Sequence, residues 1–275
     1  MTAAGRIWKK LRRHEADPCL YIYPFSIQSI VVQFTIVLAL RGKPRPSREL
    51  TQLGYRLVNV ERNENLQEWY LREVNPLGKV PTLTYSALPI PITDCLLIVY
   101  WVCDQCPRLL PKQHQTEICR LLSQLHENLE EFSSPNPAVE DFLTNHDITA
   151  SHRRALEYKR ERQRKQREIV SYNLSGGRSM TSQTTAFLQA IAELRQKHGR
   201  GDTWIFGNET GPTVLDAHVV TFVARLMDIS LEELVPPQLR AYADKIMALP
   251  EWKQVTAGRP TVWDPSMGPV ESIRI

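Results

Sequence analysis

One proline constrains this chain more than any other residue. Pro81 stands near the beginning of a short alternating run, from Val80 to Tyr85, that has the pattern of a β-strand. Because proline cannot donate to the ladder of a central strand, its position predicts a tight turn with a cis Val80-Pro81 bond. Such a bond would turn the N–H and C=O of Val80 away from the sheet. The expected result is a free backbone edge that can pair with an extended peptide.

A helix start follows this strand. The segment from Ile90 to Ile92 can pair with the first strand as a hairpin, and Thr93 to Cys95 then precede an apolar run from Leu96 to Val102. A capping residue followed by apolar residues is typical of a helix N-terminus. The free N–H groups there favour a bound carboxylate. With Lys79 on the preceding turn, the stretch has the features of a receptor for a small acidic peptide.

These residues carry a resemblance to a known family. The run from Gly78 to Leu83, with Asp94 and Cys95 opening a helix, resembles the glutathione-binding half of a cytosolic glutathione transferase. The family pattern has Glu or Asp followed by Ser at the last two positions. Asp94 fits this pattern and Cys95 departs from it, so the serine hydroxyl is missing while the backbone N–H of the helix start is kept. The resemblance covers roughly Cys19 to Ala257.

The order of elements agrees with this resemblance. Residues 19–106 read as β-α-β-α-β-β-α, which is thioredoxin-like. After a linker at 107–113, residues 114–258 carry only helical patterns. We therefore expect an α/β thioredoxin-like glutathione-binding domain plus an all-α C-terminal domain, the glutathione transferase fold. A flexible arm at 1–18 and a tail without a clear element at 259–275 complete the prediction.

Some of the expected elements are less regular than others. A helix is expected from Asn65 to Glu73, an irregular segment from Pro137 to Thr149, and one final helix from Leu239 to Ala257. Thr213 and Asp216 form a Ser/Thr-x-x-acid capping box ahead of an apolar periodic run. The same box occurs in the helical domain of the resembling family, where it serves folding.

The composition excludes several classes of protein. The chain has 275 residues, 42% of them hydrophobic and 23% charged, as in an ordinary globular protein. Its net charge of +4 is mild and its basic residues are interleaved with acids, so no nucleic-acid function is expected. No apolar stretch reaches the ~20 residues of a membrane span. Five cysteines without a secretory leader predict reduced thiols in the cytoplasm, and the lone Cys103-x-x-Cys106 pair reads as structural.

The chemistry implied by the resemblance centres on a sulfur atom. Only the thiolate of glutathione attacks, and a free thiol with a pKa of ~8.5 is mostly protonated at neutral pH. A hydroxyl that donates to sulfur, aided by a helix N-terminus, lowers that pKa. In the family this hydroxyl lies on the loop after the first strand, where Ser26 stands. Tyr23 and Ser29 are the competing hydroxyls, and backbone groups alone could stabilise the thiolate. Ser26 could then be a simple helix N-cap.

The other binding residues are carried over from the family one by one. Val80, before Pro81, should pair through its backbone with the cysteinyl part of glutathione, and Lys79 should reach the glycine carboxylate. Asp94 should take the γ-glutamyl ammonium, and the Cys95 N–H should take the γ-glutamyl carboxylate. The alternatives are an exposed turn lysine, a trans edge proline and an ordinary helix cap.

The second substrate should lie between the loop around Phe25 and the first helix of the helical domain. Leu121, Leu122, Leu125 and His126 are the candidates there, although most of them should be core and His126 is given no catalytic role. The resemblance extends to fungal transferases of secondary-metabolite clusters, one of which isomerises a trans olefin to cis in pseurotin biosynthesis. It implies a usually dimeric enzyme that uses glutathione on an electrophilic or conjugated small molecule, by conjugation or by isomerisation.

Two other functions remain open from the sequence. The fold is reused in non-catalytic interaction modules, in which case the charged helix from Arg160 to Glu168 would be the partner surface. The protein could also be a detoxifying transferase of broad specificity.

Overall fold

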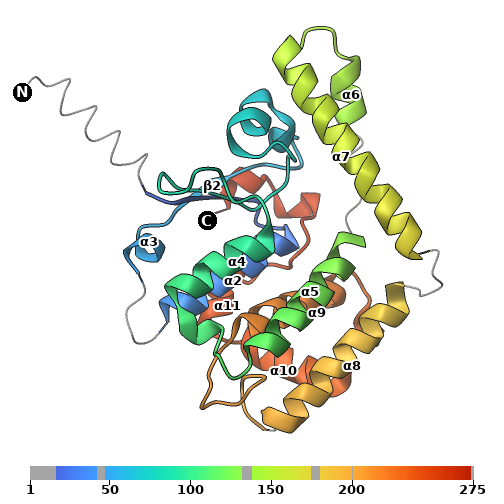
Figure 1. The fold of residues 1–275 in the computed structure, drawn as a ribbon. Helices are drawn as coiled ribbons and strands as arrows, with labels where there is room; N and C mark the ends of the chain where they lie inside the picture. The colour runs from blue at the N-terminus through green and yellow to red at the C-terminus, as the bar shows by residue number, and fades with distance from the viewer. Residues whose placement is uncertain (1–16, 42–46, 132–137, 175–179, 200, 274–275) are drawn as a thin grey trace, which may run out of the picture.

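A three-stranded sheet organises the N-terminal part of the protein (Figure 1). A computed structural model describes residues 17–41, 47–131, 138–174, 180–199 and 201–273. The sheet order is β2-β1-β3, with β1 at Cys19–Ile22, β2 at Gly54–Leu57 and β3 at Thr82–Thr84. β1 pairs with β2 in parallel and with β3 in antiparallel register. Most of the predicted N-terminal arm, 1–16, lies outside the described residues.

Successive side chains of β1 point to opposite faces of the sheet and pack into two separate apolar clusters. Leu20 and Ile22 are fully buried in the core with helices α2, Ile27–Leu40, and α4, Cys95–Gln105. Tyr21 lies in a separate apolar cluster with Tyr70. Because successive strand residues point to opposite faces, both faces of this small sheet are covered.

Helices dominate the rest of the chain. They comprise α3 at Arg48–Thr51, α5 at Gln115–Glu131, α6 at Ala138–Thr144, α7 at Ala150–Leu174, α8 at Met180–His198, α9 at Val214–Asp228, α10 at Pro237–Met247 and α11 at Pro250–Thr256. Short 3₁₀ turns lie at Glu64–Leu66, Pro107–Leu109, Glu232–Leu234, Pro265–Met267 and Val270–Ser272, and a π-helical turn at Tyr70–Val74. None of the helices in the described part of the chain is both long and apolar enough to cross a membrane.

The predicted capping box begins the central helix α9. The fully buried carboxylate of Asp216 accepts from the Thr213 N–H at 2.8 Å and from the Ile205 N–H at 2.9 Å. It also accepts from the Tyr242 hydroxyl at 2.7 Å. A buried carboxylate needs such donors, because an unpaired one would be expensive to desolvate. The box therefore joins α9, α10 and the Ile205 loop, and its prediction is confirmed.

Two local expectations hold only in a reduced form, and two others were wrong. The segment expected to be helical from Asn65 to Glu73 is helical in two short pieces, a 3₁₀ turn and a π-helical turn. Ile92 pairs with Leu83 as the expected hairpin requires, but only through a single antiparallel bridge. The segment expected to be irregular contains α6, whose Val139 is buried against another apolar cluster. The expected last helix is broken before Pro250, which has no N–H to continue a helix.

The C-terminal tail has structure that its sequence did not indicate. Its two 3₁₀ turns run beside the sheet, in red in Figure 1. Val270 is 2% exposed and joins the apolar cluster of Tyr21 and Tyr70. The Glu271 carboxylate accepts from Asn59 Nδ2 at 2.8 Å and pairs with Arg62 at 2.8 Å. These contacts fix the tail on the N-terminal half of the chain.

Candidate functional site

The Val80-Pro81 peptide bond is cis, as the sequence predicted. Strand β3 begins only at Thr82, so Val80 lies just outside the ladder. Within the described ranges, neither the N–H nor the C=O of Val80 has a hydrogen-bond partner. A buried residue with an unpaired backbone donor and acceptor is unusual, and it leaves an edge to which an extended peptide can add.

The carbonyl immediately before this edge is held firmly. Lys79 O accepts from the Tyr70 hydroxyl at 2.7 Å, from Asn75 Nδ2 at 2.9 Å and from the Thr82 hydroxyl at 3.2 Å. Gly78 has a φ of +56°, and a Cβ there would lie 2.8 Å from Asn65 O. The turn therefore requires glycine and is locked by side chains that the sequence did not single out.

Ser26 is the N-cap of α2, and its side chain differs from those of its two competitors. Its Oγ accepts from the Ser29 N–H at 3.3 Å, and no acceptor for its own O–H lies within the described residues. The Tyr23 hydroxyl donates to the Glu61 carboxylate at 2.9 Å, and burial together with this carboxylate raises the pKa of Tyr23. Ser29 is fully buried. Of these three residues, only Ser26 is partly exposed, and its hydroxyl proton is donated to no described residue.

Asp94 and Cys95 open α4 next to this loop. Asp94 caps the helix by accepting from the Leu97 N–H at 2.9 Å, and its side chain is exposed. The Cys95 thiol is buried 3.6 Å from Gln28 O, close to Ser26 in the chain. Burial, with the Asp94 charge adding to it, raises the pKa of the Cys95 thiol, so its side chain is not a reactive thiolate. The Cys95 N–H has no partner among the described residues.

Packing brings these segments together. Val80 belongs to one apolar cluster with Tyr23 and Phe25, which lie just before Ser26 in the same loop. Arg225 of α9 donates to Phe25 O at 2.6 Å and to Thr261 O at 2.6 Å. The Arg225 guanidinium thus connects the Ser26 loop to both the central helix and the tail. No local sequence motif predicts this role.

Comparisons with known proteins add a finding about the fold. No family model matches the sequence, and no curated protein matches it. Among solved structures, a bacterial Zeta-class glutathione S-transferase, holo maleyl pyruvate isomerase, is 19% identical with a TM-score of 0.53, and the match covers 89% of this chain and 100% of that chain. An Omega 3C transferase from Trametes versicolor is 13% identical with a TM-score of 0.54 over 94% and 92%. The chain has the glutathione transferase fold.

A delta-class transferase from Nilaparvata lugens gives the same result. It is 14% identical with a TM-score of 0.53, and the match covers 87% of this chain and 93% of that chain. At these identities the likeness concerns the fold alone. The thioredoxin-like N-terminal part and the all-helical C-terminal part predicted from the sequence are confirmed, whereas the site residues stay predictions.

The tail covers part of this glutathione transferase fold. Trp263, Met267 and Ile273 are partly buried against the cluster that contains Val80 and Phe25. The Asp228 carboxylate of α9 accepts from the Thr261 N–H at 2.6 Å and so anchors the beginning of the tail. The tail is therefore a candidate wall of any binding site at Val80.

The residues expected around the second substrate divide into two kinds. Leu121, Leu122 and Leu125 are at most 1% exposed, so they belong to the core. His126 is half-buried, with Nε2 lying 3.2 Å from Nε2 of His218. Burial lowers the pKa of both imidazoles, that of His218 to about 3, where the nearby His126 adds to the effect. Both rings are therefore neutral at physiological pH.

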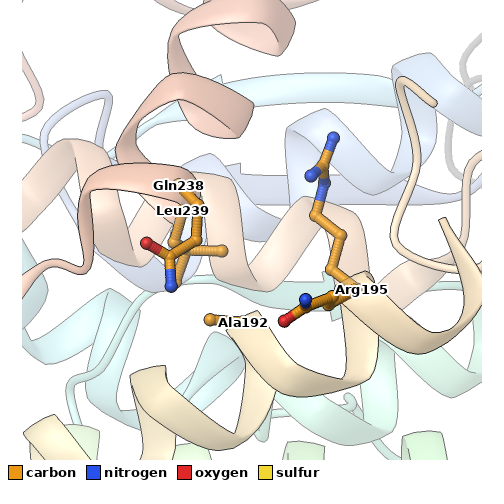
Figure 2. A pocket seen from close by; sticks show the side chains of 5 residues that line it. Ala192, Arg195, Gln238 and Leu239 are labelled. Atoms are coloured by element: carbon orange, nitrogen blue, oxygen red, sulfur yellow. The ribbon is translucent and has the colours of Figure 1, made fainter. Parts of the chain in front are cut away.

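A cavity of about 400 Å³ lies elsewhere, between α8 and α10 (Figure 2). It is lined by Ala192, Arg195, Gln196, Gln238 and Leu239. The Arg195 guanidinium points away from Ala192, lies 5.0 Å from the Tyr242 ring centroid, and donates to Asp202 O at 2.6 Å. None of the predicted site residues lines this cavity.

Proposed function

We propose that this protein is a glutathione-dependent transferase acting on an electrophilic or conjugated small molecule. The observation that carries the proposal is that three segments which pack together each present a group without a partner among the described residues: the backbone N–H and C=O of Val80, the hydroxyl proton of Ser26 and the N–H of Cys95. Glutathione is an extended tripeptide with a backbone, a thiol and two carboxylates. Its chemistry matches these groups, since each offers the complementary donor or acceptor.

The chain offers a partner for each part of glutathione. The Val80 N–H and C=O, ahead of Pro81, would pair with the cysteinyl backbone as an added strand does. Lys79 would take the glycine carboxylate. Asp94 would take the γ-glutamyl ammonium with its carboxylate, and the Cys95 N–H would take the γ-glutamyl carboxylate at the positive end of α4.

Ser26 would be the catalytic residue. Glutathione, when bound, would supply the thiol nucleophile, either for conjugation to the electrophile or for a reversible addition that results in cis/trans isomerisation. The Ser26 Oγ accepts from the Ser29 N–H, which leaves the hydroxyl proton available for donation to sulfur. Since the first turn of α2 contains no acidic residue, its positive end is not offset there. Both effects favour the charged form of the thiol and lower its pKa.

The physiological role that we propose is secondary-metabolite biosynthesis in the cytoplasm, by a homodimer. The support is the resemblance of the sequence to fungal transferases of such pathways. All five cysteines are free, which suits a reducing compartment. The solved maleyl pyruvate isomerase of this fold supports isomerisation as one of the two outcomes.

A non-catalytic interaction module is the second candidate. The position of the C-terminal tail favours this candidate. Val270 of the tail packs in the same apolar cluster as Val80, so the tail lies beside the backbone edge that glutathione would use. The partner surface would then be the charged face of α7, where Arg164 and Lys165 pair with Glu161. Glu168 of the predicted surface lies where side chains are not described.

One experiment separates the two candidates. The full chain is applied to a glutathione-affinity resin, and retained protein is assayed with an activated aryl halide and with a conjugated trans alkene. The transferase proposal expects retention, elution by free glutathione, and glutathione-dependent turnover of at least one compound. A chain that passes through the resin and turns over neither compound would overturn it.

A further inference from the structure

A lysine of the helical part is buried against the turn that precedes Val80. Lys159, on α7, is 4% exposed. Its Nζ donates to Leu77 O at 2.5 Å and lies 3.5 Å from Gly78 O. No carboxylate of the described residues forms an ion pair with it. Neutral carbonyl oxygens are thus its only partners in the part of the chain that the structure describes.

Burial of the Lys159 ammonium carries a desolvation cost in free energy. Burial, with the nearby charge of Lys79 adding to it, lowers the pKa of Lys159 to about 8. The ammonium remains mostly charged at neutral pH, and hydrogen bonds to carbonyls only partly replace its hydration. An apolar side chain of the same length would fill this space without that cost. A cation kept in such a place indicates a function that uses its charge.

The surroundings of Gly78 contain unused hydrogen-bonding capacity. An ammonium has three N–H donors, and two of those of Lys159 are directed at Leu77 O and Gly78 O. Asn65 Nδ2 donates to Gly78 O at 2.8 Å, while the buried Asn65 Oδ1 has no partner among the described residues. One donor of Lys159 therefore remains, next to the residue that precedes the free backbone edge.

We propose that Lys159 is a second cationic contact, with Lys79, for the C-terminal carboxylate of the bound tripeptide. This inference rests on the proposed function, which assigns glutathione to the Val80 edge. An anion held between the two lysines would relieve the repulsion between them and use the remaining donor. The helical part would then select the tripeptide over a shorter γ-glutamyl thiol that ends at cysteine.

The structural alternative is that Lys159 only supports the turn. In that case its loss would disturb the Val80 edge and weaken every ligand that pairs with this edge. The two roles therefore differ in ligand selectivity, because the carboxylate contact acts only on a ligand that carries glycine.

The test is calorimetric titration of the full chain with glutathione and with γ-glutamylcysteine, which lacks glycine. For Lys159→Met we expect the Kd of glutathione to rise about tenfold, or about 1.4 kcal/mol, and that of γ-glutamylcysteine to stay unchanged. Lys159→Gln keeps an N–H donor for Leu77 O without the charge, so it should resemble Lys159→Met. Lys165→Met, at an exposed position of the same helix, should bind both ligands like the parent.

The outcomes are distinct from one another. Equal weakening of both ligands by Lys159→Met, with recovery in Lys159→Gln, would overturn the inference in favour of turn support. Unchanged affinity for glutathione in both variants would overturn it outright. Failure of the parent protein to bind either ligand would instead remove the proposed function on which the inference rests. Thermal unfolding of both variants checks that each is folded, and we expect neither to be less stable than the parent.

Discussion

The turn before Val80 and the C-terminal tail meet the same apolar cluster but are specified in different ways. The turn is fixed mainly by near neighbours, since Lys79 O accepts from Tyr70, Asn75 and Thr82, and Lys159 adds one distant contact at Leu77 O. The tail is fixed by distant residues and has no periodic pattern of its own. The groups proposed for the chemistry therefore lie in segments whose local sequence already predicts their backbone. The tail instead contributes to the stability of the fold through contacts with residues distant in the sequence. Variants on the site side should change function, and variants in the tail should change stability.

The largest effect is expected at Ser26. Ser26→Ala removes the hydroxyl that would donate to sulfur, so kcat should fall about 100-fold, with little change in the Kd of glutathione. Ser47→Ala is the matched control, because Ser47 caps α3 with the same 3.3 Å contact to a helix N–H. Steady-state kinetics and titration calorimetry measure both quantities. Equal loss of turnover and affinity would identify Ser26 as a structural cap only.

Asp94 should affect binding without affecting stability. Asparagine is as good an N-cap as aspartate, so Asp94→Asn keeps the helix start while removing the charge. Loss of a charged contact to the ammonium should weaken glutathione binding by about 1.5–3 kcal/mol. Asp104→Asn, at an exposed position of the same helix, serves as the control. An unchanged Kd in Asp94→Asn would remove this carboxylate from the site.

The tail should show the reverse pattern. Val270→Ala deletes buried methyl groups and should lower the free energy of unfolding by about 1–2 kcal/mol, leaving the Kd of glutathione unchanged. Val235→Ala, at another buried valine of the C-terminal half, should cost a similar amount. Denaturant unfolding of both variants measures the comparison. If Val270→Ala unfolds like the parent, the tail is not held on the cluster and the contrast fails.

The smallest effect concerns pH. The folded-state pKa of Lys159 is lowered to about 8 from 10.5, first by burial and then by Lys79. Between these values the unfolded chain binds more protons than the native chain, so this group makes stability rise with pH. Below pH 8 the cost of the buried charge is fully present. The stability advantage of Lys159→Met over the parent should therefore shrink between pH 8 and 10.5, and a constant difference would contradict the lowered pKa.

Local turn chemistry made part of this site predictable. The proline at the start of a strand predicted the cis bond, and the Thr213–Asp216 spacing predicted the cap of α9. What could not be predicted joins residues far apart in the chain. The Arg225 contact to Phe25 O spans 200 positions, and that of Lys159 to Leu77 O spans 82. The sequence around Arg225 and around Lys159 contains no local pattern that predicts these partners.

The same reason explains the errors in secondary structure. The spacing of apolar residues favoured a single helix from Asn65 to Glu73, but the buried side chains of Leu66 and Tyr70 belong to two different clusters. A 3₁₀ turn and a π-helical turn serve both clusters. Tertiary packing decided there, as it did for α6, whose Val139 is buried with Leu66 and Leu156.

The central claim is that the Val80 edge binds a γ-glutamyl thiol beside a helix start that ionises its sulfur. The most direct measurement is the thiolate absorbance of glutathione bound to the full chain, titrated with pH by difference spectroscopy. The account predicts a pKa for the bound thiol clearly below the free value of ~8.5, and a return toward that value in Ser26→Ala. A bound thiol that titrates like free glutathione would contradict the claim.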